Sequence, residues 1–143
     1  MELFAPVAFA DLLDAFEWVN GTALMENSAY VSRTTEKISL ASSVMELDDE
    51  LPEDIDEGSL YVAVPHKIDL NLGKNVATSF AQDYLPDSYK DVCGIFRQRG
   101  AYGRFKDLLE RKGCLDAWYA YEAKSTERAL REWCVDNAVT TLG

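Results

Sequence analysis

The sequence predicts an α+β fold in a single domain of 143 residues. Short β-prone segments and one helical segment gather in residues 1–70, and from residue 71 onward the apolar pattern is helical. Strands that precede helices, rather than alternating with them, are typical of this class. The chain is 48% hydrophobic, and a chain of this length buries enough surface for one core. We expect an N-terminal helix with a small antiparallel sheet, then about four helices in residues 71–143.

The first element is an amphipathic helix expected over residues 7–19. Apolar side chains return there every three or four positions, which is the period of one helix face. Asn20-Gly21 follows, and these residue types tolerate the left-handed turn that often ends a helix. Packing against a core accounts for this face, so we assign it no function. Its apolar residues are Phe9, Leu12, Leu13, Phe16 and Val19.

Three short β-prone segments come next, at residues 23–25, 29–33 and 37–40. The last two flank Thr34-Thr35-Glu36 and predict a hairpin. Tight hairpin turns favour Gly or Asn where φ is positive, and Thr35 is neither. We therefore expect a turn longer than the two-residue minimum.

An acidic connector occupies residues 46–57, where eight of twelve residues are Asp or Glu and none is Lys or Arg. We interpret it as a solvated loop. A calcium loop is the alternative, but the acids lack the register of an EF-hand, with its central Gly and closing Glu. A core strand is expected over residues 59–64, a short apolar run that stops at Pro65.

Residues that break helices divide residues 71–143 into four predicted helices. The first helix ends at Leu85-Pro86, and the second starts beyond a cap at Asp87 or Ser88 and ends at Gly100. A third closes at Gly113, and the fourth is the longest. The apolar faces of the four helices contain Leu72, Val76, Phe80 and Tyr84; Tyr89, Val92, Cys93 and Phe96; Tyr102, Phe105, Leu108 and Leu109; and Leu115, Tyr119, Ala123, Leu130 and Trp133.

Charge is spread unevenly along a chain whose net charge is −11. Residues 1–93 hold eighteen acids and five Lys or Arg, whereas residues 94–143 hold seven acids and nine Lys or Arg. An acidic protein of this kind has little general affinity for nucleic acid, because it repels the phosphate backbone. The bases concentrate in residues 94–112, with six Lys or Arg and two acids.

Cysteine and histidine content predicts neither a metal site nor a cofactor. Cys93, Cys114 and Cys134 are too far apart for a CxxC pair, and His66 alone does not complete a Cys/His cluster with them. This usage is typical of a reduced, cytoplasmic compartment. The N-terminal run has no basic region of a signal peptide, and no stretch reaches the roughly 20 apolar residues of a membrane helix.

The basic and aromatic segment at residues 97–107 is the clearest candidate binding surface. Gly100 precedes the start of a helix, whose first N–H groups lack partners and favour an anion. Arginines can bind a phosphate or carboxylate through two hydrogen bonds, and aromatic rings can stack on a base. The residues assigned to this surface are Arg97, Arg99, Gly100, Tyr102, Arg104, Lys106, Trp118 and Tyr121.

The alternative interpretation of the same residues is structural. Tyr102 and Phe105 are spaced three apart, as core residues of one helix would be. Arg104 and Lys106 would then face solvent or pair with the protein's own acids. On the last helix, Trp118 and Tyr121 share one side, whereas Tyr119 and Trp133 lie nearer another. Either a neighbouring helix covers Trp118 and Tyr121, or these two rings form a contact surface.

Sequence motifs in the same region resemble those of a known family. Arg99-Gly100-Ala101-Tyr102-Gly103-Arg104-Phe105-Lys106-Asp107, then Trp118-Tyr119-Ala120-Tyr121, then Glu132-Trp133, are similar in order to the bacterial uncharacterised protein family 0158. Members of that family carry an RGA-aromatic stretch leading to RFKD, a WYAF-like cluster and a late EW. The resemblance covers about residues 85–137. It implies a bacterial cytoplasmic protein, and it implies no activity.

Three functional hypotheses follow from these observations. The first is a non-enzymatic binding or regulatory domain that contacts a protein partner through the basic and aromatic surface, away from membranes. The second is a nucleotide- or RNA-binding module that uses Arg97, Arg99 and Arg104. The third is an enzyme with a carboxylate site. Catalysis by a Ser or Cys nucleophile is not indicated, because the sequence carries no recognisable nucleophile motif and His66 is its one histidine.

Overall fold

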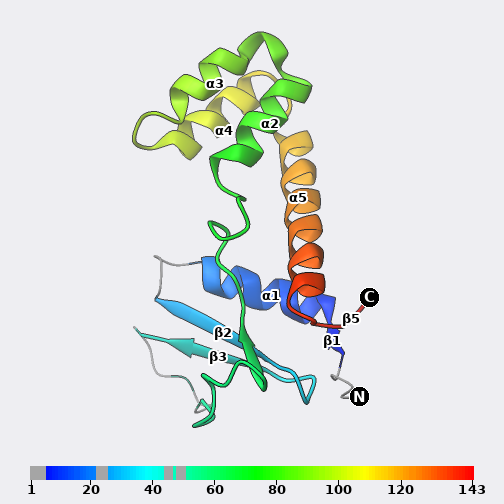
Figure 1. Ribbon diagram of the computed structural model, residues 1–143. Coiled ribbons are helices and arrows are strands. Elements are labelled where there is room, and N and C mark those ends of the chain that lie inside the picture. Colours follow the sequence, from blue (N-terminus) through cyan, green and yellow to red (C-terminus); the bar gives the residue numbers. More distant parts are fainter. Residues whose placement is uncertain (1–5, 22–25, 44–46, 48–50) are drawn as a thin grey trace. The chain divides into compact units, whose positions relative to one another are not determined.

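The computed structural model describes residues 6–21, 26–43, 47 and 51–143 (Figure 1). The chain divides into two compact units: residues 1–70 with 130–143, and residues 71–129. The division after residue 70 falls where the sequence pattern changes from strands to helices. The fold class is α+β, as the sequence predicts.

The first unit begins with a two-residue strand, β1 (Val7–Ala8), followed directly by helix α1 (Phe9–Asn20). The prediction of a helix from residue 7 was wrong by these two residues. β1 pairs in parallel with β5 (Thr141–Leu142), and the Val7 N–H donates to the Thr140 carbonyl at 2.8 Å. Pairing with a segment from the other end of the sequence overrides the local helical period at Val7.

Helix α1 ends where the sequence predicts, but its last turn has a different backbone conformation and different hydrogen bonds from those expected. Gly21 has φ −80° and is therefore not in the left-handed turn that we expected. The Asn20 amide instead donates to the Phe16 carbonyl at 2.8 Å, and its oxygen accepts the Lys67 N–H at 2.9 Å. The side chain of Asn20 thus joins the last turn of α1 to the segment that follows β4.

A three-stranded antiparallel sheet completes this unit. It contains β2 (Asn27–Ser32), β3 (Ile38–Ser42) and β4 (Tyr61–Ala63), in the order β3-β2-β4. The predicted hairpin and its long turn are confirmed, because Val31 pairs with Ile38 across a loop of residues 33–37. A strand is confirmed at the centre of residues 59–64, but the prediction of a core strand was wrong, because β4 lies at the edge of the sheet and none of its three residues is fully buried. The segment at residues 23–25 lies outside the described residues.

The acidic connector is described over residues 51–57, and the remainder of residues 46–57 lies outside the described residues except for residue 47. The described part forms turns, as the loop interpretation predicts. The Ile55 N–H donates to the Pro52 carbonyl at 3.2 Å, and the Glu57 N–H donates to the Asp54 carbonyl at 2.9 Å.

Helix α1 lies against one face of the sheet (Figure 1). The Asn27 amide donates to the Trp18 carbonyl at 3.1 Å, which identifies the face of β2 that points toward α1. Side chains alternate along a strand, so Ala29 and Val31, each 1% exposed, point the same way. The buried face of α1 against them contains Phe9, Leu12, Ala15, Phe16 and Val19.

Residues 130–143 also belong to the first unit, whereas the sequence pattern assigns them to the helical part. The Arg33 guanidinium donates to the Asn137 carbonyl at 2.6 Å and to the Gly58 carbonyl at 2.9 Å. The Arg131 guanidinium lies over the Phe9 ring, 4.0 Å from its centroid. These contacts hold the end of the last helix and the segment after it against the strands and α1.

The second unit is the group of helices that the sequence predicts. It contains α2 (Lys74–Tyr84), a 3-10 turn (Pro86–Ser88), α3 (Tyr89–Ile95), α4 (Ala101–Arg111) and the first part of α5 (Leu115–Asp136). Ser88 precedes α3, but its side chain accepts no hydrogen bond from the first N–H groups of the helix. The buried core contains Val76, Ala77, Phe80, Ala81, Val92, Phe105, Leu108, Leu109 and Trp118.

Candidate binding surfaces

The connection between α3 and α4 places the predicted basic residues on the surface. Residues 96–100 reverse the chain through backbone hydrogen bonds such as Arg97 N–H to the Gly94 carbonyl at 3.2 Å. Gly100 has φ +69°, and α4 begins at the next residue. No side chain caps this helix start, so the first N–H groups of α4 lack an intrahelical or side-chain acceptor.

The arginines of this connection are exposed. The Arg104 guanidinium donates to the amide oxygen of Gln98, which fixes it beside the turn. Within the described residues, no carboxylate pairs with Arg97 or Arg99. The structural alternative concerns Arg104 and Lys106, which it expects to face solvent or to pair with the protein's own acids, and both side chains are exposed.

Two aromatic residues of the predicted surface are part of the core instead. Trp118 is 1% exposed, and its ring makes T-shaped contacts with Phe80 and Phe105, with centroids 5.5 and 4.9 Å apart. Tyr121 is half-buried, with its ring centroid 5.3 Å from that of Phe80. Neither ring lies on an open surface beside the arginines, so their role in this structure is packing.

Tyr119, which the apolar pattern places on the buried face of α5, is 45% exposed. The Lys106 ammonium lies 5.7 Å from its ring centroid. The apolar pattern does not identify the buried residue here. Trp118 and Tyr119 lie three and four residues after Leu115, and the helical period allows either of them on the buried face. Burying the larger indole removes more apolar surface from water.

Tyr102 is 39% exposed and completes the surface around the turn. One edge of its ring packs against Phe96, with centroids 5.1 Å apart. Burial raises the pKa of the Tyr102 hydroxyl, and the nearby Glu122 carboxylate raises it further. The hydroxyl is therefore protonated at neutral pH. We call the exposed surface the basic corner, and it consists of Arg97, Arg99, Gly100, Tyr102, Arg104 and Lys106.

Two glycines of the basic corner region should respond in opposite ways to alanine. Gly100→Ala should lower the free energy of unfolding by about 1 kcal/mol, because an L-residue is strained at φ +69°. Gly103 lies inside α4 with open space around it, so Gly103→Ala should raise that free energy by about 0.5–1 kcal/mol. Urea denaturation followed by circular dichroism measures both changes. Equal shifts in the same direction would contradict the left-handed assignment of Gly100.

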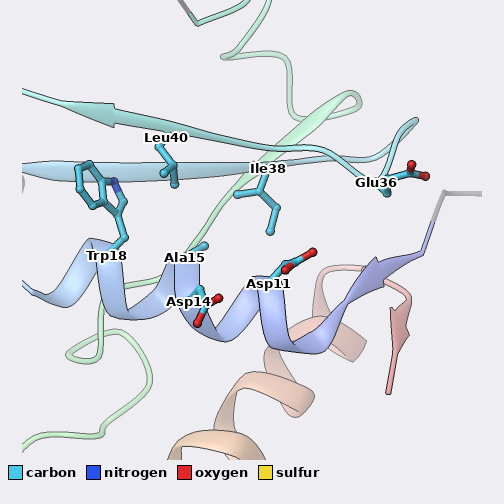
Figure 2. A pocket seen from close by; sticks show the side chains of 7 residues that line it. All are labelled: Asp11, Asp14, Ala15, Trp18, Glu36, Ile38 and Leu40. Atoms are coloured by element: carbon cyan, nitrogen blue, oxygen red, sulfur yellow. The ribbon is translucent and has the colours of Figure 1, made fainter. Parts of the chain in front are cut away.

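A second surface, in the first unit, was not predicted from the sequence. A hollow of about 280 Å³ lies between α1 and β3 (Figure 2). Trp18 stands toward one end and Glu36 toward the other, with the aliphatic side chains of β3 between them. We call it the α1–β3 groove, and its lining residues are Asp11, Asp14, Ala15, Trp18, Glu36, Ile38 and Leu40.

The walls of the α1–β3 groove are apolar and its rim is acidic. Asp11, Asp14 and Glu36 are exposed, and none of the residues that line the groove is Lys or Arg. The Trp18 indole N–H donates to the Ser28 carbonyl at 3.0 Å, which fixes this ring as a wall. The sequence carries a weak signal for the groove, since Asp11, Asp14 and Trp18 are three and four residues apart and share one side of α1.

Another hollow, of about 360 Å³, lies beside β2, β4 and the segment that follows β4. Asn27 lines it and is 4% exposed, and the described residues offer no hydrogen-bond partner to its side-chain oxygen. His66 lines it as well. The His66 ring accepts the Ile68 N–H through Nδ1 at 3.2 Å, and the Asp69 carboxylate accepts the His66 N–H at 3.1 Å. His66 thus helps to build a turn, as its position after the strand suggests.

Neither a metal-ligand cluster nor a membrane-spanning helix occurs in the described parts of the chain. No group of three or more His, Cys, Asp or Glu side chains there is arranged to hold a metal ion. No described helix combines the length and the apolar character needed to cross a bilayer. Cys93, Cys114 and Cys134 form no disulfide, and burial raises the pKa of the Cys114 and Cys134 thiols.

Comparison with known proteins gives no assignment. No protein-family model matches the chain, nor does any curated protein or solved structure. The resemblance to the uncharacterised protein family 0158 stays a prediction from the sequence motifs.

Proposed function

We propose that the chain is a non-enzymatic protein-binding domain whose contact surface is the basic corner. The observation that carries this proposal is the exposure of Arg97 and Arg99, with no carboxylate partner among the described residues. Guanidinium groups bind carboxylates through paired, charge-assisted hydrogen bonds. An acidic segment of a partner would supply the carboxylates, and the half-exposed Tyr102 would supply apolar contact area.

The distribution of charge supports a protein partner over a nucleic acid. The second unit holds ten Lys or Arg and eight acids, whereas the first unit holds four Lys or Arg and seventeen acids. The net charge of −11 disfavours the binding of a long polyanion to the chain as a whole. A short acidic segment requires only the local positive charge.

A nucleotide- or RNA-binding module is the second candidate, and it uses the same arginines. The uncapped start of α4 favours it, because N–H groups at the start of a helix bind phosphate oxygens. The aromatic ring of Tyr102 would stack on a base.

Charge reversal at the basic corner tests the proposal. Arg97→Glu with Arg99→Glu should lower capture of the specific partner from a lysate of the source cells by about tenfold or more, because each pairing lost weakens binding. Lys74→Glu with Lys124→Glu is the matched control, since it makes the same change of charge at exposed positions outside the basic corner. Quantitative mass spectrometry of the captured proteins measures the loss.

Two outcomes would decide against a protein partner at this surface. Equal capture by the basic-corner variant and the control variant would remove the basic corner from consideration. Binding of a labelled RNA or nucleotide that requires Arg97 and Arg99 and falls steeply with added salt would favour the second candidate.

A further inference from the structure

The face of the sheet that packs on α1 is wider than one helix can cover. Neighbouring strands lie about 4.8 Å apart, and packed helices about 8–10 Å apart, so one helix covers about two strands of a three-stranded sheet. In this unit β2 is central, β3 and β4 are the edges, and α1 contacts β2 and β3. Helix α1 buries Ala29 and Val31 of β2 almost completely.

The edge strand presents its apolar side chains on that same face. Ile38 pairs with Val31, and Leu40 pairs with Ala29, so all four side chains point to the α1 side of the sheet. Leu40 is nevertheless 37% exposed. Helix α1 thus contacts β3 without sealing it, and the α1–β3 groove lies along this partly covered edge strand (Figure 2).

The charge around the α1–β3 groove determines which kind of partner it can bind. Three carboxylates stand on the rim of the groove, from Asp11 and Asp14 on α1 and from Glu36 on the hairpin loop. The surrounding unit carries seventeen acids and four Lys or Arg, so its field attracts cations and repels anionic partners. The apolar walls, from Trp18, Ile38 and Leu40, require that the occupant also bring apolar surface.

We propose that the α1–β3 groove docks a basic amphipathic helix of another protein. The helix inserts one or two large apolar side chains between Trp18 and the aliphatic residues of β3, which suits a hollow of about 280 Å³. Its Lys and Arg residues, one turn to either side of that anchor, pair with Asp11, Asp14 and Glu36. The docked helix covers the part of β3 that α1 leaves exposed, at Leu40. This surface is separate from the basic corner and opposite to it in charge, so neither proposal depends on the other.

A direct binding measurement tests this proposal with designed peptides. The probe is a fluorescently labelled helix of about 16 residues, with Leu and Phe anchors spaced three and four apart and Lys on the flanking positions. One comparison peptide keeps the anchors and replaces each Lys by Glu, and another keeps each Lys and replaces the anchors by Gln. Only the first peptide should bind the intact chain, as followed by fluorescence anisotropy, and its affinity should fall as salt is added.

Neutral isosteres in the protein locate the binding. Asp11→Asn, Asp14→Asn and Glu36→Gln together should weaken binding of the probe by about tenfold or more. Glu17→Gln, Glu53→Gln and Glu57→Gln make the same change of charge at exposed positions outside the groove, and should weaken it by less than about threefold. Leu40→Asn should weaken binding without changing charge. Thermal denaturation checks that each variant remains folded.

Several results would overturn the proposal. Equal weakening by the two triple variants would mean that the peptide follows the net charge and not the groove. Binding of the Gln-anchored peptide or of spermine as tightly as the probe would make the occupant a simple polycation. Concentration-dependent self-association that the groove variant abolishes would make a second copy of this chain the occupant.

Discussion

Trp118→Ala should lower the free energy of unfolding of the second unit by about 3–5 kcal/mol. The indole is 1% exposed and lies between the rings of Phe80 and Phe105 in the core of that unit. Truncation removes its buried apolar surface and leaves a cavity that close-packed helices only partly fill. Guanidinium denaturation followed by far-ultraviolet circular dichroism measures the loss.

Two further variants test whether the loss comes from buried packing at Trp118. Tyr119→Ala, one residue away on α5, removes a ring that is 45% exposed and should cost about 1 kcal/mol or less. Trp118→Phe keeps an aromatic ring and removes an indole N–H that is buried without a partner among the described residues. It should therefore cost far less than Trp118→Ala, because leaving a buried donor unsatisfied is itself unfavourable. Equal costs for the two Trp118 variants would contradict this account.

Leu12→Ala should produce the corresponding loss in the first unit, about 2–5 kcal/mol. Leu12 is fully buried on the face of α1 that packs on the sheet. Glu17→Ala on the same helix is the control, because Glu17 is exposed and its removal should change the free energy of unfolding by about 0.5 kcal/mol or less. Urea denaturation measures both, and a similar loss for the two variants would contradict the packing of α1.

The pair Trp118→Ala and Leu12→Ala also tests the single domain that the sequence predicts. Helix α5 is continuous from Leu115 to Asp136, and its residues contribute to both compact units. If the chain unfolds as one domain, either substitution lowers the midpoint of one shared transition. Two transitions, each moved by only one of the substitutions, would show that the units unfold separately.

Local features of the sequence were sufficient for most elements. Helix ends at Leu85-Pro86 and Gly113 depend on backbone preferences of the residues themselves, and such preferences act without tertiary contacts. The predicted helix end at Gly100 was wrong, because α3 ends at Ile95 and Gly100 instead precedes the start of α4. The hairpin loop was predictable from such local preferences. The β1–β5 pair was not, since it joins Val7 to Thr141, and no local period records so distant a contact.

The two binding surfaces differ in how far the sequence could predict them. Charged groups such as Arg97 and Arg99 rarely become buried, so a basic cluster in the sequence remains a basic cluster on the surface. The α1–β3 groove depends on where α1 lies across the sheet, and this is decided by packing after the elements form. Along the chain, Asp11 and Asp14 resemble an ordinary solvated helix face.

The parallel pairing of β1 with β5 has a consequence for synthesis on the ribosome. Residues 71–129 form one uninterrupted stretch, so the second unit has all of its parts soon after residue 129 leaves the exit tunnel. The β1–β5 pair of the first unit must wait, because Val7 and Ala8 find their partners only when Thr141 and Leu142 emerge. Domains generally fold as units during translation. The helical unit is thus available to fold first, although its residues are made later than most of the sheet.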